Sequence, residues 1–237
     1  MNRAPQLFRI DRLDLSFTPQ PWRFADENRG KIDAFFAELQ KQSPAIWNGR
    51  VLLMHRHVVR EGVFEGEYLE TDFASFIAWR RWGSPPAGVR DCFSAGAIVS
   101  SDGAVLLGQM GTHTANAGKI YFPCGTPDPS DIIGDKVDLA WSVARELKEE
   151  TGMDIRDFSP DPGWTTVVDG PLIAQIRTLH SADPADALRQ RMLAHLASEK
   201  QPELSDIYIV RGPQDYTAAM QPFVTAFLDG LFAGHPS

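Results

Sequence analysis

The chain is poor in cysteine and in long apolar runs. Its 237 residues include two cysteines, Cys92 and Cys124, so a disulfide framework is excluded, and no Cys or His spacing suggests zinc. The first residues contain no apolar stretch of the signal-peptide type, and no run approaches the roughly 20 apolar residues of a membrane span. We therefore expect a soluble protein of the reducing cytoplasm, with no membrane partner.

Positive charge is also scarce. The chain has 23 Lys and Arg against 31 Asp and Glu, a formal net charge of −8, which argues against a protein that grips nucleic-acid backbone. An anionic substrate would need positive charge at its binding site, and in an acidic protein a bound cation supplies that charge. The 43% hydrophobic content is enough for one large core, or for a catalytic domain with a smaller appendage.

A Gly- and Pro-rich stretch, Gly83 to Gly88, reads as a linker, so we expect an N-terminal α+β appendage over residues 1–85 and a catalytic domain over 86–237. Alternation and helical spacing predict the elements of the appendage. These are a strand within 7–17, a helix over 26–42, strands over 51–59 and 63–69, and a helix capped by Thr71 or Asp72 that runs to Trp82.

The second domain is expected to be an α/β/α sandwich around a mixed sheet. A polar loop with Pro127, Pro129 and Gly134 should precede a helix that Asp138 caps, and Pro222 must either kink the last helix or start a second one. Predicted strands cover 94–100, 104–109, 119–123, 164–168, 172–180 and 206–210, and predicted helices cover 138–151, 183–199 and the C-terminal segment.

Three glutamates, Glu146, Glu149 and Glu150, stand at positions i, i+3 and i+4, so a helix displays them on one side. Their repulsion destabilises the helix unless a cation bridges them, and hard oxygen ligands select Mg²⁺ or Mn²⁺. Arg145 can pair with Glu149 and fix its rotamer, while Leu147 points into the core. The alternative interpretation is an ordinary solvated face balanced by lysine and arginine.

The string Arg145 to Gly152, RELKEETG, resembles the second half of the Nudix box. The resemblance implies metal-assisted hydrolysis of a nucleoside diphosphate linked to another group. It implies Glu146, Glu149 and Glu150 as metal ligands, with Glu149, Arg145 and Glu203 as catalytic residues. The general base would be a box glutamate or a residue of a later loop such as Glu203, and an ordinary loop carboxylate is an equal alternative for Glu203.

The first half of the box departs from the family pattern. The leading glycine should lie fourteen residues before the arginine and a glutamate eight before it, where this chain has Asp131 and Val137. Gly125 is the equivalent glycine that we favour, in a turn where Cys124 replaces a second glycine, and both residues are expected to bind substrate. The loop then carries six extra residues, and Asp135 or Asp138 stands in for the absent glutamate.

Several further residues have two interpretations. His113 and Lys119 could touch phosphate or decorate a surface loop, and Trp164, Tyr121 and Phe122 could stack on a base or belong to the core. The appendage loosely resembles the N-terminal extensions of Nudix enzymes that act on nucleotide-sugars, so a UDP- or ADP-linked sugar is the expected substrate. A catalytically silent nucleotide-binding module is the competing function, and the appendage could instead form a homodimer.

Overall fold

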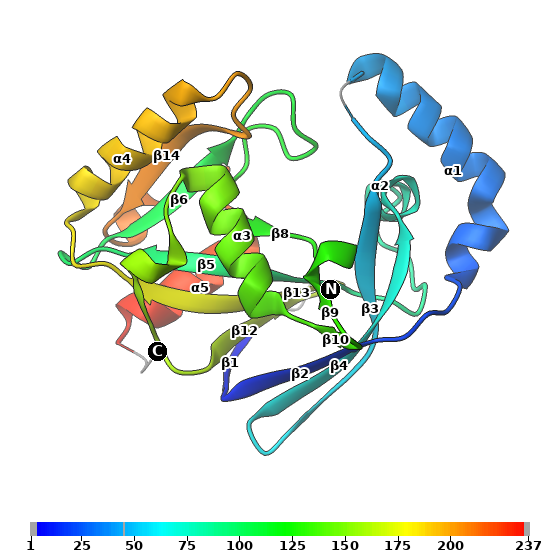
Figure 1. Ribbon diagram of the computed structural model, residues 1–237, viewed down its shortest axis with the longest axis horizontal. Coiled ribbons are helices and arrows are strands. Elements are labelled where there is room, and N and C mark those ends of the chain that lie inside the picture. Colours follow the sequence, from blue (N-terminus) through cyan, green and yellow to red (C-terminus); the bar gives the residue numbers. More distant parts are fainter. Residues whose placement is uncertain (1–3, 45, 235–237) are drawn as a thin grey trace. The chain divides into compact units, whose positions relative to one another are not determined.

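The computed structural model describes residues 4–44 and 46–234, which form two compact units (Figure 1). The larger unit comprises Met1–Arg12, Phe93–Gly125 and Leu139–Ser237, and the smaller one comprises Leu13–Cys92 and Thr126–Asp138. Within the part of the chain that is described, no helix has both the length and the apolar character needed to cross a membrane.

The larger unit is built on a nine-stranded mixed sheet with the main order β1-β12-β13-β5-β6-β14. Strands β13 and β5 run parallel, since Leu179 lies beside Gly96 and the amide of Ser181 donates to the carbonyl of Val99. The strands are β1 (Gln6–Ile10), β5 (Asp91–Val99), β6 (Val105–Met110), β7 (Ile120–Tyr121), β8 (Cys124–Gly125), β11 (Ser159–Pro160), β12 (Trp164–Asp169), β13 (Leu172–His180) and β14 (Leu204–Val210).

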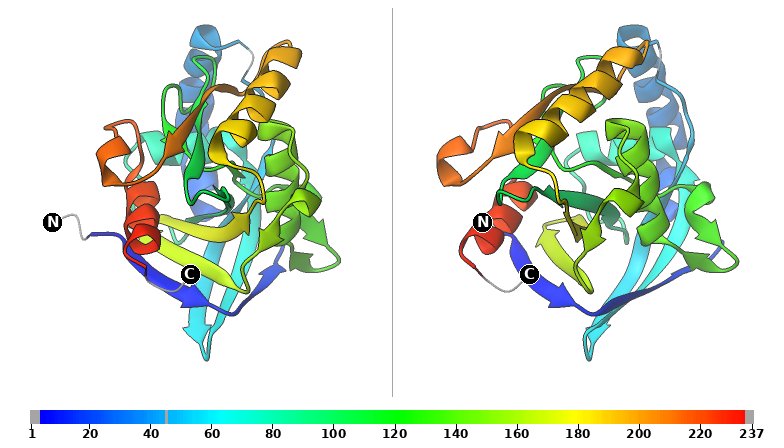
Figure 2. Two further views of the ribbon diagram at one scale, coloured as in Figure 1. Left: turned by 90° about the vertical axis from the view of Figure 1, so that its left-hand side faces the viewer. Right: turned by 60° about the vertical axis from the view of Figure 1, so that its left-hand side comes forward.

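Helices cover both faces of this sheet. Successive side chains of a strand point to opposite faces. On β5, Gly96 faces Val143 of α3 (Leu139–Thr151), whereas Phe93 meets the ring of Phe223 of α5 (Pro222–Phe232) at 5.5 Å. The third helix, α4 (Ala185–Ser198), packs against β14 and α3 (Figure 2). The layering is therefore the expected α/β/α sandwich.

Proline decides where the last helix begins. Pro222 occupies the first turn of α5, where its missing N–H costs no hydrogen bond, so it starts the helix and does not kink one. The helix then buries Phe223, Val224, Phe227 and Leu228. These residues make α5 the most apolar cover of the sheet.

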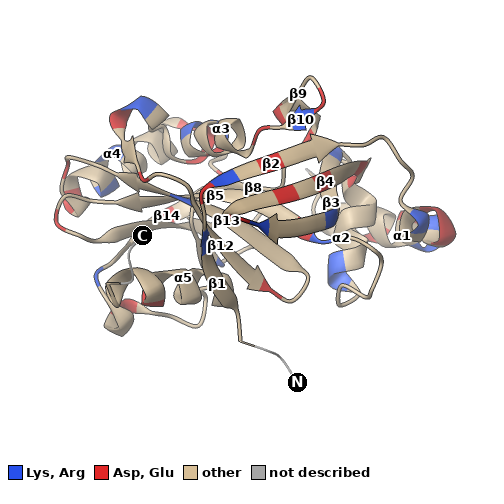
Figure 3. Ribbon diagram, turned by 90° about the horizontal axis from the view of Figure 1, so that it is seen from below, with Lys and Arg blue, Asp and Glu red and all other residues tan. Residues whose placement is uncertain are grey.

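The smaller unit has a five-stranded sheet in the order β3-β4-β2-β10-β9. Two helices, α1 (Arg23–Gln42) and α2 (Phe73–Arg81), pack through aromatic edges such as Trp22 against Trp79 at 6.0 Å. The strands are β2 (Arg12–Phe17), β3 (Arg50–Arg60), β4 (Val63–Asp72), β9 (Ile132–Ile133) and β10 (Lys136–Val137). Lys and Arg are interspersed with Asp and Glu on α1, which gives a mixed-charge surface (Figure 3).

The predicted domain boundary near residue 85 differs from the observed division of the chain at two segments. Strand β1 belongs to the larger unit because it pairs with β12 over five residues, and the segment expected to be one strand over 7–17 breaks at Asp11 into β1 and β2. The segment Thr126–Asp138, expected to be a polar loop, joins the smaller unit through β9 and β10, where Lys136 pairs with Ser16. Two-residue strands leave no period in a sequence, so this pairing was not predictable.

Candidate active site

Helix α3 carries the glutamate-rich string on a rigid support. Leu139, Val143 and Leu147 recur at four-residue spacing and are at most 2% exposed, so this stripe fixes the helix against the sheet. Glu149 lies on the exposed side, with 60% of its side chain accessible. The helix is thus amphipathic.

Two of the glutamates are buried. Glu146 is 9% and Glu150 is 3% exposed, although glutamates are almost never fully buried without a partner. Both side chains lie against the short strand β8, which pairs with β5 through Ser94 opposite Gly125. The larger unit therefore encloses two carboxylates beside strand β8, which precedes the segment Thr126–Asp138.

Strand β8 contacts both buried glutamates. The sequence placed Cys124 and Gly125 in a turn, but they pair with β5 as a short strand. The amide of Cys124 donates to Oε2 of Glu150 at 3.2 Å. A Cβ atom at Gly125 would overlap the carboxylate of Glu146, so only glycine leaves room for that carboxylate. The structure thus brings Gly125 and Cys124 together with α3, the box helix, which carries the string that resembles the Nudix box. Gly125 lies twenty residues before Arg145 in the sequence.

Arg145 bridges two glutamates of its own helix. One of its terminal nitrogens lies 2.8 Å from Glu146 and 3.2 Å from Glu149. The sequence predicted the pairing with Glu149 but not the pairing with Glu146. Only 19% of the Arg145 side chain is exposed, so its position is restricted and it can orient both carboxylates.

Two carboxyl groups of this region, those of Glu150 and Glu203, have raised pKa values. Burial raises the pKa of Glu150 well above its usual value, and the charges of Glu146 and Glu203 add to the effect, while the Cys124 hydrogen bond opposes it. The residue Glu203 is exposed as a whole, but loss of solvent around its carboxyl group and the charge of Glu149 raise its pKa too. Glu203 therefore belongs to the same carboxylate cluster, although 53 residues separate it from Glu150.

The donor chemistry of this cluster suits a hard divalent cation. Carboxylate oxygens are the ligands that Mg²⁺ and Mn²⁺ prefer, and a cation would offset the repulsion that raises the pKa of Glu150. Across residues 4–44 and 46–234, no three His, Cys, Asp or Glu side chains are already arranged to hold a metal ion. Arg145 pairs with Glu146 and Glu149 and supplies the positive charge there.

The other residues singled out in the sequence divide between the site and the core. His113 is exposed and its charge lowers the pKa of Glu203, so the two lie close. Burial and the charges of Cys124 and Glu150 raise the pKa of Tyr121, whose hydroxyl accepts a hydrogen bond from Asn116 at 3.2 Å. Tyr121 therefore borders the carboxylate cluster.

The remaining aromatic candidates are structural. Phe122 is fully buried and meets Phe227 at 5.2 Å, and Trp164 is buried with the guanidinium of Arg177 over its ring at 5.4 Å. Lys119 is exposed. Asp135 and Asp138, considered as substitutes for the absent glutamate, both belong to the smaller unit.

One contact that the sequence did not suggest lies at the end of the box helix. His195, on α4, places its Nε2 atom 3.1 Å from the carbonyl oxygen of Glu149. No sequence signal identifies this residue, because α4 follows α3 only after three strands and 33 residues. The pairing depends on how α3 and α4 pack.

No family model and no curated protein matches the chain. Among solved structures, the Nudix hydrolase RenU from M. smegmatis is 16% identical, with a TM-score of 0.39 over 62% of this chain and 86% of that one. The MutT protein from Methanosarcina mazei Go1 is 17% identical, with a TM-score of 0.41 over 62% and 96%. A bifunctional NMN adenylyltransferase/ADP ribose pyrophosphatase from Francisella tularensis, complexed with AMP and a Mn ion, is 12% identical, with a TM-score of 0.41 over 67% and 46%.

The motif and its surroundings agree with one another. The string from Arg145 to Gly152 forms the end of a helix that packs on a mixed sheet, and Gly125 of β8 lies against its buried Glu146. The larger unit thus has an α/β/α fold, and its helix α3 carries the string that resembles the second half of the Nudix box.

Proposed function

We propose that this protein is a metal-dependent hydrolase that cleaves the pyrophosphate bond of a nucleoside diphosphate linked to another moiety. The clustering of Glu146, Glu149, Glu150 and Glu203 supports this proposal most directly. Burial and mutual repulsion raise the pKa of Glu150, an arrangement that costs stability unless it serves to hold a cation. A merely solvated charged face would leave these glutamates exposed, whereas Glu146 and Glu150 are buried.

Glu146, Glu149 and Glu150 would hold Mg²⁺ or Mn²⁺. Such an ion, when bound, neutralises phosphate charge and lowers the pKa of a coordinated water. Arg145 keeps the carboxylates of Glu146 and Glu149 within reach of each other. Its catalytic contribution is therefore to orient the ligands.

Glu203 is our candidate for the general base. Its raised pKa brings it nearer to neutrality, where a base both accepts a proton and is regenerated efficiently. Glu149, the most exposed glutamate of the box helix, is the alternative base. Separate Glu203→Gln and Glu149→Gln variants distinguish the two, because loss of a base lowers kcat even at saturating metal.

Substrate contact is proposed for Cys124 and Gly125. Both are partly exposed beside the carboxylates that would hold the metal. The amide of Cys124 already donates to Glu150, so β8 also positions this ligand. A substrate phosphate would approach next to this strand.

The proposed substrate is a UDP- or ADP-linked sugar, cleaved to a nucleoside monophosphate and a sugar phosphate. Support comes from the size of the smaller unit, which is far more than a tail, because contacts remote from the reacting bond contribute to transition-state binding. The segment Trp47 to Arg50 has a structural role as well, because Asn48 accepts a hydrogen bond from Ala74 at the start of α2. The alternative function is a catalytically silent module that binds such a nucleotide.

A substrate screen tests the proposal. Purified protein is incubated with Mg²⁺ or Mn²⁺ and with nucleotide-sugars, dinucleotides and nucleoside triphosphates, and the products are identified by mass spectrometry. Turnover of a nucleotide-sugar that Glu150→Gln abolishes, and that the exposed control Glu38→Gln retains, supports the enzyme. Nucleotide binding without turnover by the wild type would instead support the silent module.

Compartment and assembly complete the proposal. We place the protein in the cytoplasm, where the buried thiol of Cys92 and the partly exposed thiol of Cys124 stay reduced. We also propose a homodimer. Light scattering coupled to size exclusion measures the mass of the particle, and a value of one chain at all concentrations would contradict the dimer.

A further inference from the structure

The side chain of His195 lies very close to Gly152, at the end of the box helix. Gly152 follows the helix with φ of 72°, the left-handed conformation of a helix C-terminus, and its amide donates to the carbonyl of Lys148 at 3.0 Å. A Cβ at this position would lie 2.6 Å from Cγ of the His195 ring. Two independent constraints therefore demand glycine here, one from the backbone and one from the imidazole.

The His195 ring makes a directed contact with the helix. Its Nε2 atom lies 3.1 Å from the carbonyl oxygen of Glu149, and since a carbonyl only accepts, this nitrogen carries the hydrogen. The bond holds the peptide that joins Glu149 to Glu150. Carbonyls in the last turn of a helix have no partner within the helix, so a donor from another element fixes their direction.

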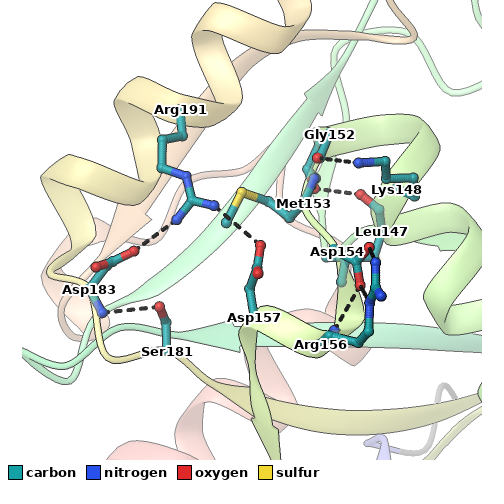
Figure 4. A network of polar contacts seen from close by, with 11 residues as sticks. Leu147, Lys148, Gly152, Met153, Asp154, Arg156, Asp157, Ser181, Asp183 and Arg191 are labelled. Carbon is teal, nitrogen blue, oxygen red and sulfur yellow. Dashed lines mark hydrogen bonds and ion pairs between the residues drawn. The ribbon is translucent and has the colours of Figure 1, made fainter.

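Other contacts fix α4 beside this helix end. Arg191, one turn before His195, pairs with Asp183 at 2.8 Å and with Asp157 at 3.2 Å, which ties α4 to the segment that follows α3 (Figure 4). Glu199 lies 3.4 Å from the same Nε2 atom, so this nitrogen faces both the Glu149 carbonyl and the Glu199 carboxylate. The ring is therefore held between α4 and the end of α3.

We propose that His195 is a positioning residue that sets the direction of Glu149 and Glu150 toward a divalent cation. This inference rests on the proposed metal-dependent function. His195 need not touch metal or substrate, because it acts through the peptide between the two ligands. Residues that orient metal ligands typically change metal affinity by about 10- to 100-fold when they are removed.

Binding of Mn²⁺ alone, followed by the electron paramagnetic resonance signal of the free ion, tests the proposal without any turnover. Leucine at position 195 fills similar space and donates no hydrogen bond, so His195→Leu should weaken Mn²⁺ binding by about 10- to 100-fold. Glutamine places an amide nitrogen near the position of Nε2, so His195→Gln should stay within about 3-fold of the wild type. Gln190→Ala, an exposed change on the same helix, is the control and should bind Mn²⁺ normally.

The outcomes separate the two proposals. If Glu150→Gln binds Mn²⁺ as tightly as the wild type, the metal site itself is wrong. If Glu150→Gln loses binding while folded His195→Leu keeps it, only the role of His195 is overturned. Should His195→Leu fail to fold, His195→Asn decides the matter, because its shorter amide does not reach the Glu149 carbonyl. Equal Mn²⁺ affinity of the asparagine and glutamine variants would then overturn the proposal.

Discussion

The carboxylate of Glu146 fills the space that a side chain at Gly125 would need. The two residues lie on different elements, β8 and α3, and meet only because β8 pairs with β5 beneath the helix. Gly125→Ala should displace the Glu146 carboxylate and break its 2.8 Å pairing with Arg145. We expect activity to fall about 10- to 100-fold with the fold retained, measured by phosphate release and near-ultraviolet circular dichroism.

Gly30→Ala is a matched control for that change. Gly30 lies within α1, its Cβ would meet nothing within 4 Å, and alanine favours a helix by about 0.5–1 kcal/mol. This variant should be fully active and slightly more stable. Normal activity in Gly125→Ala would show that the position of the Glu146 carboxylate is unimportant for catalysis.

We expect Arg145 to affect catalysis through its ion pairs with Glu146 and Glu149. Arg145→Ala frees the carboxylates of Glu146 and Glu149 and should lower kcat/KM by about 10- to 100-fold. Arg145→Lys, which keeps the charge but cannot present two planar donors, should recover only part of the loss. Steady-state kinetics over a range of Mg²⁺ concentrations measures this. A rate equal to that of the wild type at saturating Mg²⁺ would identify Arg145 as a surface charge only.

Asp72 should make the smaller unit sensitive to acid. Burial of its carboxyl acts to raise its pKa, but hydrogen bonds from Arg29 and Ser75 outweigh burial and hold the pKa below its ordinary value of 3.8. A lowered folded pKa means that ionised Asp72 stabilises the fold above 3.8, and that this stability is lost as pH falls through the folded value. The pairing with Arg29, at 2.8 Å, is the structural source of the effect.

Two variants separate the charge of Asp72 from its cap. Asp72 also accepts from the amide of Ser75 as the N-cap of α2, so Asp72→Ala should cost about 1 kcal/mol for the lost cap in addition to the ion pair. Asp72→Asn keeps a cap and loses the charge. Urea unfolding should show wild type more stable than Asp72→Asn near neutral pH, with the difference shrinking toward about pH 2. A constant difference would contradict the assignment.

Deletion of residues 1–12 should destabilise the larger unit, because these residues include strand β1 and belong to that unit. Strand β1 pairs with β12 from Gln6 opposite Val168 to Ile10 opposite Trp164, and its loss leaves β12 as an unpaired edge strand that can pair with other chains. We expect a lower melting temperature and concentration-dependent aggregation, measured by calorimetry and light scattering. A deletion of residues 1–4, which ends before β1, should behave like the wild type. A soluble, fully stable chain without residues 1–12 would show that β1 is dispensable.

The sequence identified the box helix because its pattern depends on local spacing, and the metal chemistry expected of that helix stays a prediction. Glu146, Glu149 and Glu150 share a side of any helix that they enter, and Leu139, Val143 and Leu147 define the opposite stripe. The long strands β3, β4, β12 and β13 were likewise predictable from alternation and turn residues. Pro222 left two alternatives, and packing of α5 on the sheet selected the one in which it starts the helix.

Only the tertiary structure decided what surrounds the box helix. The close approach of Glu146 to Gly125, the influence of Glu203 on Glu150, and the contact of His195 with Glu149 join residues that are 21 to 53 positions apart. Likewise, the larger unit includes β1 and the smaller unit includes Thr126–Asp138 because of pairing between distant segments. Strand pairing and helix packing are set by burial and by hydrogen bonds between distant segments, and no local period encodes which segments will meet.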